Sequence, residues 1–252
     1  MVKALPIPEQ KHPEHRQVQF PESRSLGELY VVDSVGKSEF LGEATGLVEV
    51  PAGKHLALYY SFDPTYGLSP LLEVSPDALS SISFLGSDIR DEELAIVGRL
   101  VGLREIDISC TAIGDRGVAY LAPLVRLTKL NLSSTKVTDQ GLVVLAQLRS
   151  LQELVLDDTQ IGDSGLSYIA QLPRLKTLSL SFTRITNKGL PKLKEAGQLE
   201  RLRLNCTRVG DDGLTHVARM KGLKELWVRS TDVTYPGLVE LTKWLSDCEI
   251  IR

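Results

Sequence analysis

The sequence predicts an α/β solenoid, in which a parallel β-sheet lines the inner face and short helices cover the outer face. Six threonines recur every 24 residues, from Thr111 to Thr231, without a slip. Within each period the apolar spacing changes from the alternation of a strand to the three- and four-residue spacing of a helix. A single period cannot bury its own apolar face, so neighbouring periods must stack. Repetition, spacing and the need to stack together indicate this fold class.

Each period begins with a strand and ends with a helix. In the period that starts at residue 127, Leu130 and Leu132 are two residues apart, which places both on one face of a strand. Thr138 and Asp139 then favour a helix start, since Thr suits the N-cap and Asp suits the first turn. The apolar residues of the helix follow at i, i+3, i+4 and i+6: Leu142, Leu145, Ala146 and Leu148. One period is therefore a strand, a turn and a short helix.

Seven such periods run from residue 79 to residue 246. The common pattern is L-x-x-L-x-L-x-x-T-x-[IV]-[TG]-D-x-G-L-x-x-L-A-x-L, and the first period is its least regular copy. That copy keeps the apolar positions and one acidic residue: Leu79, Ile82, Phe84, Ile89, Asp91, Leu94, Val97 and Leu100. Because helices are wider than the ~4.8 Å spacing of strands, the stack is expected to curve.

This pattern resembles the leucine-rich-repeat family. The threonine-bearing period is similar to the repeats of many bacterial proteins and of substrate-binding subunits of ubiquitin ligases. The resemblance implies a right-handed, horseshoe-shaped solenoid with a concave parallel sheet and convex helices. The family usually has Asn or Cys where this chain has Thr. That departure concerns hydrogen bonds inside the turn and leaves the expected fold unchanged.

Both ends of a solenoid need covers, because a terminal repeat would otherwise expose its core. We assign residues 1–16 to a flexible tail and residues 17–78 to a small β-rich N-terminal cap. The cap contains three runs of β-forming residues, at 29–32, 47–50 and 56–62, with a turn at 51–53. At the other end, residues 247–252 are expected to add a cap strand after a longer last helix.

Three columns of repeated residues resemble motifs but are better explained by structure. The threonines are expected to hydrogen-bond backbone groups in the turn. The acidic column could be taken for metal ligands, but we interpret it as helix caps: Asp115, Asp139, Asp163 and Asp211, with Asn187 substituting. The glycines from Gly117 to Gly237 permit close helix packing, and they lack the spacing of a phosphate loop.

Composition and charge argue against several classes of function. No stretch approaches the roughly 20 apolar residues that cross a membrane, and no signal peptide is recognisable. If Met1 is the natural start, we expect a cytoplasmic protein. The cysteines Cys110, Cys206 and Cys248 form neither a disulfide framework nor a zinc motif. Residues 1–78 carry 6 basic and 11 acidic side chains, whereas residues 175–252 carry 14 and 9. This mildly basic end falls short of a nucleic-acid-binding face.

Function is expected on the concave face, where side chains between the buried leucines point outward. The early half of that face is acidic, and the late half is basic with exposed aromatic residues. We predict ten partner-binding residues: Asp107, Glu153, Asp157, Asp158, Phe182, Arg201, Arg203, Asn205, Trp227 and Arg229. Trp and Arg dominate many protein interfaces, which favours a patch around Trp227. The alternative is an idle, solvated surface with Trp227 packed under the C-terminal cap.

We therefore predict a scaffold that binds a protein or peptide partner, and not an enzyme. The histidines His12, His15, His55 and His216 pair with no plausible nucleophile, and no cofactor or metal is expected. No nucleic acid or membrane partner is expected either. Three alternatives remain: a regulatory adaptor or inhibitor that presents a target to an enzyme complex, a carbohydrate or lipid site in the β-rich segment, and weak head-to-tail self-association.

Overall fold

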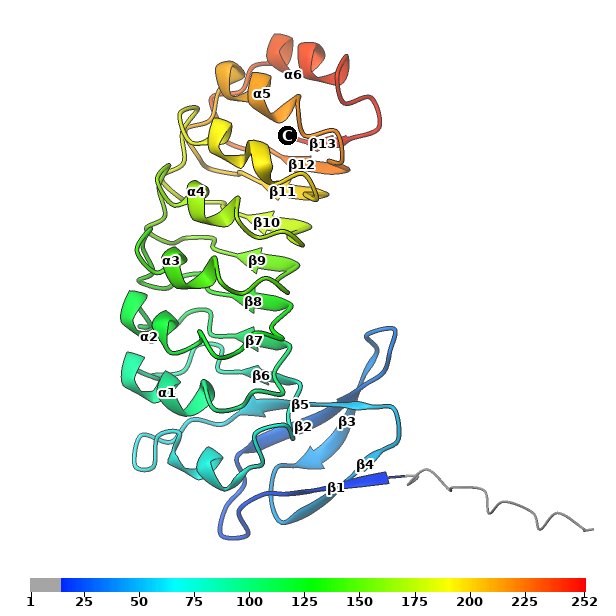
Figure 1. Cartoon of the computed structure of the whole chain (residues 1–252), viewed down its shortest axis with the longest axis vertical. Helices are drawn as coiled ribbons and strands as arrows, with labels where there is room; N and C mark the ends of the chain where they lie inside the picture. Colours follow the sequence, from blue (N-terminus) through cyan, green and yellow to red (C-terminus); the bar gives the residue numbers. More distant parts are fainter. Residues whose placement is uncertain (1–14) are drawn as a thin grey trace, which may run out of the picture.

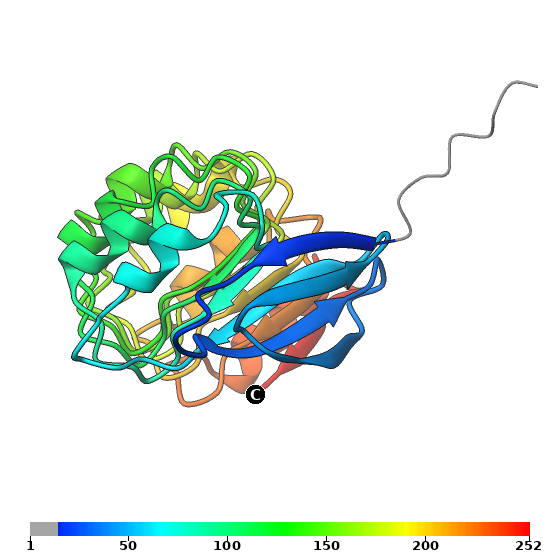
Figure 2. The same cartoon turned by 90° about the horizontal axis from the view of Figure 1, so that it is seen from below.

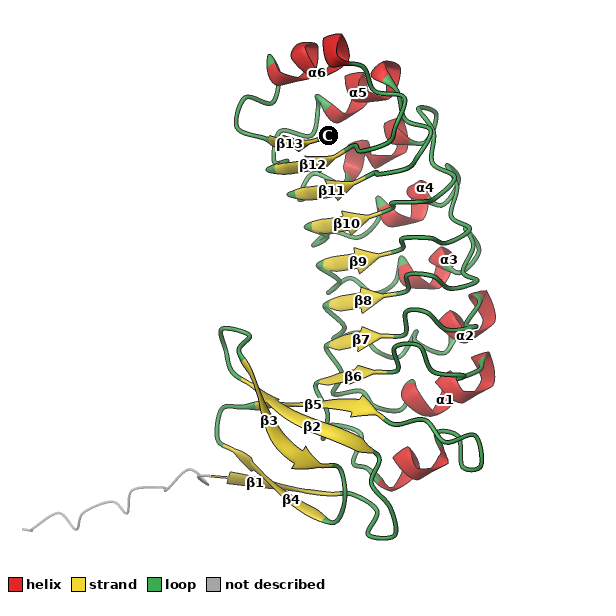
Figure 3. Cartoon of the chain, turned by 180° about the vertical axis from the view of Figure 1, so that it is seen from behind, coloured by secondary structure: helices red, strands yellow, loops and turns green. Residues whose placement is uncertain are grey.

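A computed structural model describes residues 15–252 and shows a curved stack of strands and helices (Figure 1). One 11-stranded sheet runs through its length, in the order β13-β12-β11-β10-β9-β8-β7-β6-β5-β2-β3. The helices of the repeats cover one side of this sheet, and the other side forms the inner curve (Figure 3). The predicted α/β solenoid, with a parallel concave sheet and convex helices, is confirmed.

The strands of the repeats are short and pair in parallel at a constant offset of one repeat, as in Ile106 opposite Leu130. From β6 to β12 the middle residue of every strand is buried and its two neighbours face the concave side. The strands are β6 (Ser81–Ser83), β7 (Glu105–Asp107), β8 (Lys129–Asn131), β9 (Glu153–Val155), β10 (Thr177–Ser179), β11 (Arg201–Arg203), β12 (Glu225–Trp227) and β13 (Glu249–Ile251).

The helices of the repeats are short because each has to return the chain to the next strand before the following repeat begins. They are η2 (Asp91–Glu93) with α1 (Leu94–Val97), α2 (Asp115–Ala119), α3 (Leu142–Leu145), α4 (Leu166–Ile169), η3 (Leu190–Glu195), α5 (Asp211–Val217) and α6 (Tyr235–Thr242). The repeat that contains Pro191 near its helix start forms a 3-10 helix, η3, in place of an α-helix.

The threonine column closes the turn after each strand. Each Thr hydroxyl donates to the carbonyl three residues earlier, as Thr159 does to Leu156 at 2.6 Å. The same bond occurs in all six copies. The residue before each Thr has a left-handed backbone, which is costly for a residue other than glycine. The Thr bond therefore helps to hold a strained turn, as the sequence predicted.

The acidic column links one repeat to the next. The Asp163 carboxylate accepts from the backbone N–H of Thr186 at 2.8 Å and from its hydroxyl at 2.7 Å. Asp115 and Asp211 bond to the next repeat in the same way. The donors from Thr234 lower the pKa of Asp211. Asp115 and Asp211 lie in the first turns of their helices, as predicted, but their carboxylates accept hydrogen bonds from the following repeat and not from their own helix.

The glycine column makes room for these carboxylates. A Cβ added at Gly165 would lie 2.6 Å from Oδ1 of Asp139 in the preceding repeat. Equivalent clashes would occur at Gly141 and Gly189, with Asp115 and Asp163. The two columns are therefore parts of one inter-repeat contact.

Replacing Asp163 with alanine tests this contact. The change leaves the Thr186 backbone N–H without its acceptor, so we expect the free energy of unfolding to fall by about 1–2 kcal/mol. Urea unfolding followed by circular dichroism would measure the loss. Ser164→Ala, at the exposed neighbouring residue, is the matched control and should change little. Equal midpoints for the two variants would contradict the inter-repeat role.

The N-terminal region extends the sheet of the repeats. Its elements are β1 (His15–Gln19), β2 (Gly27–Val32), β3 (Ser38–Glu43), β4 (Leu47–Pro51), β5 (His55–Tyr60) and η1 (Ser69–Glu73). Strand β5 pairs in parallel with β6 and antiparallel with β2, whereas β1 and β4 form a separate two-stranded sheet. Seen from below, these strands cross the end of the stack (Figure 2).

The core runs without a break from this region into the repeats. Phe20, Leu29 and Leu58 belong to the same buried cluster as Ile82 of the first repeat. The structure places His15 and Arg16 in β1, so this strand begins inside the segment predicted as a flexible tail. The remainder of that prediction, residues 1–14, lies outside the described residues.

Candidate functional site

In the first row of concave side chains, acidic and basic residues on neighbouring strands form ion pairs. It contains Glu105, Lys129, Glu153, Thr177, Arg201 and Glu225, one from each successive strand. The Lys129 ammonium lies 2.7 Å from Glu105, and the Arg201 guanidinium lies 3.0 Å from Glu225. The bond to Glu105 raises the pKa of Lys129. Arg201 and Glu153, both predicted to bind a partner, therefore stand in a row where neighbouring repeats supply opposite charges.

Three other predicted site residues serve as hydrogen-bond acceptors within the fold. Asp157 accepts from the Ser181 backbone N–H at 2.7 Å, and Asn205 accepts from the Arg229 backbone N–H at 2.8 Å. Asp107 accepts from the backbone and hydroxyl of Ser109. These contacts join neighbouring repeats or brace the end of a strand. The bonds of Asp157 and Asn205 depend on geometry between repeats, which the sequence pattern does not reveal, whereas the bonds of Asp107 to Ser109 are local.

The concave-facing positions at β10, in the middle of the face, are buried. Thr177, Ser179 and Ser181 are buried, although the pattern predicted outward-facing positions for all three. Their side chains are small, and the strands on either side carry larger ones. The structure thus separates the predicted acidic residues of β7 and β9 from the basic residues of β11 and β12.

A cluster of aromatic and cationic side chains occupies the late concave face. The Arg203 and Arg229 guanidinium groups lie 5.3 and 5.9 Å from the centre of the Trp227 ring. Trp227 is half-buried, and its indole Nε1 is buried with no hydrogen-bond partner among the described residues. Within residues 15–252, neither arginine forms an ion pair with an acidic side chain. We call these three residues the Arg–Trp–Arg stack.

Phe182 and Asp158 stand in the turns at the ends of the strands. Phe182 is 62% exposed and has a positive φ of 58°, an unusual conformation for a bulky residue. Asp158 is also exposed, and it accepts from the Ser134 hydroxyl at 3.0 Å. Phe182 is therefore an exposed aromatic residue one repeat away from the strand that carries Arg203.

A second aromatic cluster, missed by the sequence analysis, lies at the N-terminal end of the same face. The Tyr30 ring is 5.5 Å from Phe40 and 5.1 Å from Tyr59, both in edge-to-face geometry. Phe40 and Tyr59 are more than half exposed. Tyr59 pairs with Ser83 and so faces the concave side. The alternation of buried and outward residues in β5 was the available signal.

The N-terminal region also contributes to a hollow beside the first strands of the repeats. The turn between β2 and β3 rises beside the start of the concave face (Figure 3). Its residues, with His55, Arg104, Glu105 and Lys129, line a space of about 380 Å³. Val35 at the tip of the turn is 87% exposed. The N-terminal region therefore adds a hollow lined mostly by polar residues, with the exposed Val35 at its edge, to the start of the concave surface.

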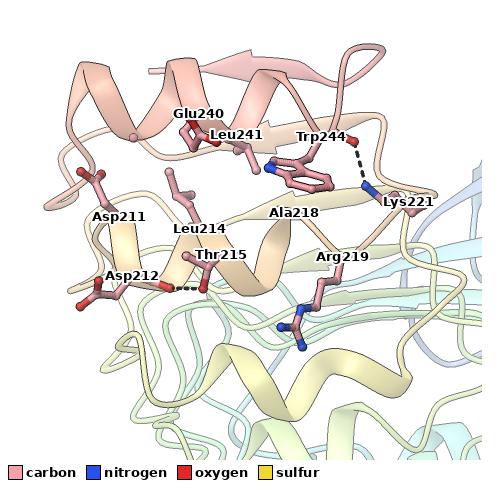
Figure 4. Close-up of a pocket in the computed structure, with 11 residues that line it drawn as sticks. Asp211, Asp212, Leu214, Thr215, Ala218, Arg219, Lys221, Glu240, Leu241 and Trp244 are labelled. Atoms are coloured by element: carbon pink, nitrogen blue, oxygen red, sulfur yellow. Dashed lines mark hydrogen bonds between the residues drawn. The ribbon is translucent and has the colours of Figure 1, made fainter.

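The convex side has a hollow of its own, between α5 and α6. It measures about 600 Å³ and has Leu214, Ala218 and Leu241 among its lining residues (Figure 4). Trp244 forms one wall and is 59% exposed, whereas Met220, at the same position one repeat earlier, is buried. Leu245 is buried beside Trp244 instead. The last repeat thus turns a large aromatic residue outward, next to the Lys221 ammonium at 5.2 Å.

The described part of the chain, residues 15–252, has no group of three or more His, Cys, Asp or Glu side chains arranged to hold a metal ion. None of its helices combines the length and the apolar character needed to cross a membrane.

Comparison with known proteins supports the architecture. The sequence profile of the Leucine Rich repeat family matches residues 103–122, 127–146, 147–170 and 171–193. An internalin, inlF, from Listeria monocytogenes is similar in structure, with a TM-score of 0.58 and 24% identity over 69% of this chain. The chain spans only 48% of that protein. Internalin C2 from the same organism is similar with a TM-score of 0.55 and 22% sequence identity. The match covers 71% of this chain and 84% of internalin C2. No curated protein matches the chain.

Proposed function

We propose that the concave face of this solenoid binds a protein partner, because the repeats at residues 103–122, 127–146, 147–170 and 171–193 match the Leucine Rich repeat family, whose members generally act as protein-interaction scaffolds. The observation that carries this proposal is the pair of aromatic groups at the two ends of one continuous sheet. Tyr30, Phe40 and Tyr59 lie at one end, and Trp227 lies at the other. Large aromatic residues on an open surface are typical of interaction sites.

The size of the surface supports a protein or a long peptide. Seven strand intervals separate β5 from β12, which corresponds to ~34 Å at ~4.8 Å per interval. Small-molecule sites are instead enclosed pockets of a few hundred Å³. An extended partner can contact both aromatic ends, and a small molecule cannot.

Replacing Trp227 with alanine tests the proposal, with Trp244→Ala as the matched control on the convex side. We expect Trp227→Ala, and likewise Tyr59→Ala, to weaken partner binding at least ~30-fold, the usual effect of removing an interface anchor. Quantitative affinity purification would identify proteins that wild type and Trp244→Ala retain and the two concave variants lose. Binding affinities would then be measured with the purified partner by calorimetry.

The same experiment can contradict the proposal. A partner that Trp227→Ala retains and Trp244→Ala loses would place binding in the hollow between α5 and α6. Circular dichroism spectra equal to wild type are required of all three variants, so that a folding defect is not mistaken for lost binding.

A further inference from the structure

We propose that the segment bound at the Arg–Trp–Arg stack is acidic, and that its Asp or Glu carboxylates are held by Arg203 and Arg229. This inference rests on the proposed function, because it names the partner chemistry of the same face. The arginines of this part of the face differ in their partners. Arg201 is paired with an acidic side chain of the protein, whereas Arg203 and Arg229 contact Trp227 and have no acidic partner among the described residues.

Arg201 and Arg203 are the two outward-facing residues of the same short strand. The Arg201 guanidinium has its anion, Glu225, at 3.0 Å on the next strand. Arg203 faces Trp227 at the corresponding position of that strand and has no anion among the described residues. Arg229, two residues beyond Trp227, is equally without one in the described part of the chain. Two cations are therefore available on a surface where neighbouring charges are already paired.

A cation–π contact with an aromatic ring positions an arginine without using its hydrogen bonds. A guanidinium group has five N–H donors, and those that do not face the ring remain available. They match the two oxygens of a carboxylate in a bidentate pair, and such charge-assisted bonds are stronger than neutral ones. The contacts of Arg203 and Arg229 with Trp227 thus prepare both side chains for an anion.

Trp227 itself offers a further donor. Its Nε1–H is buried without a partner among residues 15–252, a state that costs free energy in most proteins. An oxygen of a bound acidic segment that reaches this edge of the ring would accept from the N–H, while Arg203 and Arg229 remain over the ring and hold the carboxylates.

The wider charge distribution favours the same class of partner. Arg184 and Arg208 are exposed in the turns after β10 and β11, and residues 175–252 carry 14 basic against 9 acidic side chains. Asp107 and Glu105, on β7, lie four strands away from β11. An acidic segment is attracted to the late end of the face and repelled from the early end, which favours its binding at β11 and β12.

Tryptophan fluorescence gives a direct test, because the chain has only two tryptophans, Trp227 and Trp244. Trp244→Phe leaves Trp227 as the sole emitter, and it would be titrated with a synthetic peptide of eight glutamates at low ionic strength. We expect a saturable change in emission that weakens on addition of salt. The Trp227→Phe protein, which reports only on Trp244, should show no change.

Arginine variants in the Trp244→Phe protein test the assignment. The double variant, which carries both Arg203→Gln and Arg229→Gln, should bind octaglutamate at least ~10-fold more weakly. Arg201→Gln is the matched control, since Arg201 already has Glu225, and it should change the affinity less than threefold.

Several results would overturn the inference: no response to octaglutamate, an equal response to octalysine, or an equal loss in the Arg201 variant. Tighter binding of a single-stranded oligonucleotide than of octaglutamate would also overturn it. If octaglutamate fails while a natural partner still depends on Trp227, the acidic class is wrong and the concave interaction stands. If octaglutamate binds as expected and the partner ignores Trp227, the proposed function is wrong.

Discussion

Replacing Leu154 with alanine is expected to lower the free energy of unfolding by ~2–5 kcal/mol, the usual cost of emptying a tightly packed leucine site. Leu154 is the central residue of β9 and is fully buried, between Leu130 of β8 and Leu178 of β10. A stack of repeats has contacts only between neighbours, so a cavity in the middle weakens both halves at once.

The measurement is urea unfolding monitored by circular dichroism. Leu85→Ala is the matched control, because Leu85 is 62% exposed and loses little on truncation. A shift of the Leu154→Ala midpoint no larger than that of the control would show that the core between β8 and β10 is not tightly packed. A broadened or biphasic transition would instead indicate that the two halves unfold separately.

Replacing Gly27 with alanine is expected to cost ~3–5 kcal/mol or to prevent soluble expression, since it combines a backbone clash with conformational strain. Gly27 begins β2 with a φ of 132°, a region closed to other residues. An added Cβ would lie 2.0 Å from the carbonyl oxygen of Tyr59, so β2 would have to separate from β5.

The Gly36→Ala variant serves as a control that has the conformational strain of a positive φ but no steric clash. Gly36 lies in the turn between β2 and β3 with a φ of 85°, and no atom lies within 4 Å of its added Cβ. It should therefore show only conformational strain, of ~1–2 kcal/mol. Hydrogen exchange would locate the damage: Gly27→Ala should deprotect β2 and β5 while β8 to β11 stay protected. Unchanged protection in β2 and β5 would contradict this account.

The repeats could be predicted from the sequence because their contacts recur at one fixed separation. Leu130 pairs with Leu154, and Leu154 with Leu178, so the repeat period already specifies the register. The continuation of the sheet into β5, β2 and β3 follows no period. It depends on contacts such as Gly27 with Tyr60, and single-sequence patterns do not specify pairings of this kind. For that reason the aromatic cluster of Tyr30, Phe40 and Tyr59 was missed.

The candidate site was predicted in outline, but the roles of its members were not. Outward positions follow from strand alternation, so Arg203 and Trp227 could be placed on one face. Which arginine has an anion depends on side chains one repeat apart, and strand alternation alone does not distinguish Arg201 from Arg203. Asp157 and Asn205 are predicted partner contacts, and the structure adds that both accept hydrogen bonds from the following repeat.

The inter-repeat contact formed by the aspartate and glycine columns, here called a joint, makes each repeat a separate structural unit that also sets the length of the binding face. Because each joint involves only adjacent repeats, a whole repeat added between β8 and β9 leaves every other joint intact. Such an insertion would move Trp227 away from Tyr59 by ~4.8 Å, one strand spacing. The distance between the two ends of the binding face is thus adjustable in fixed steps, by duplication or loss of whole repeats, without redesign of either end.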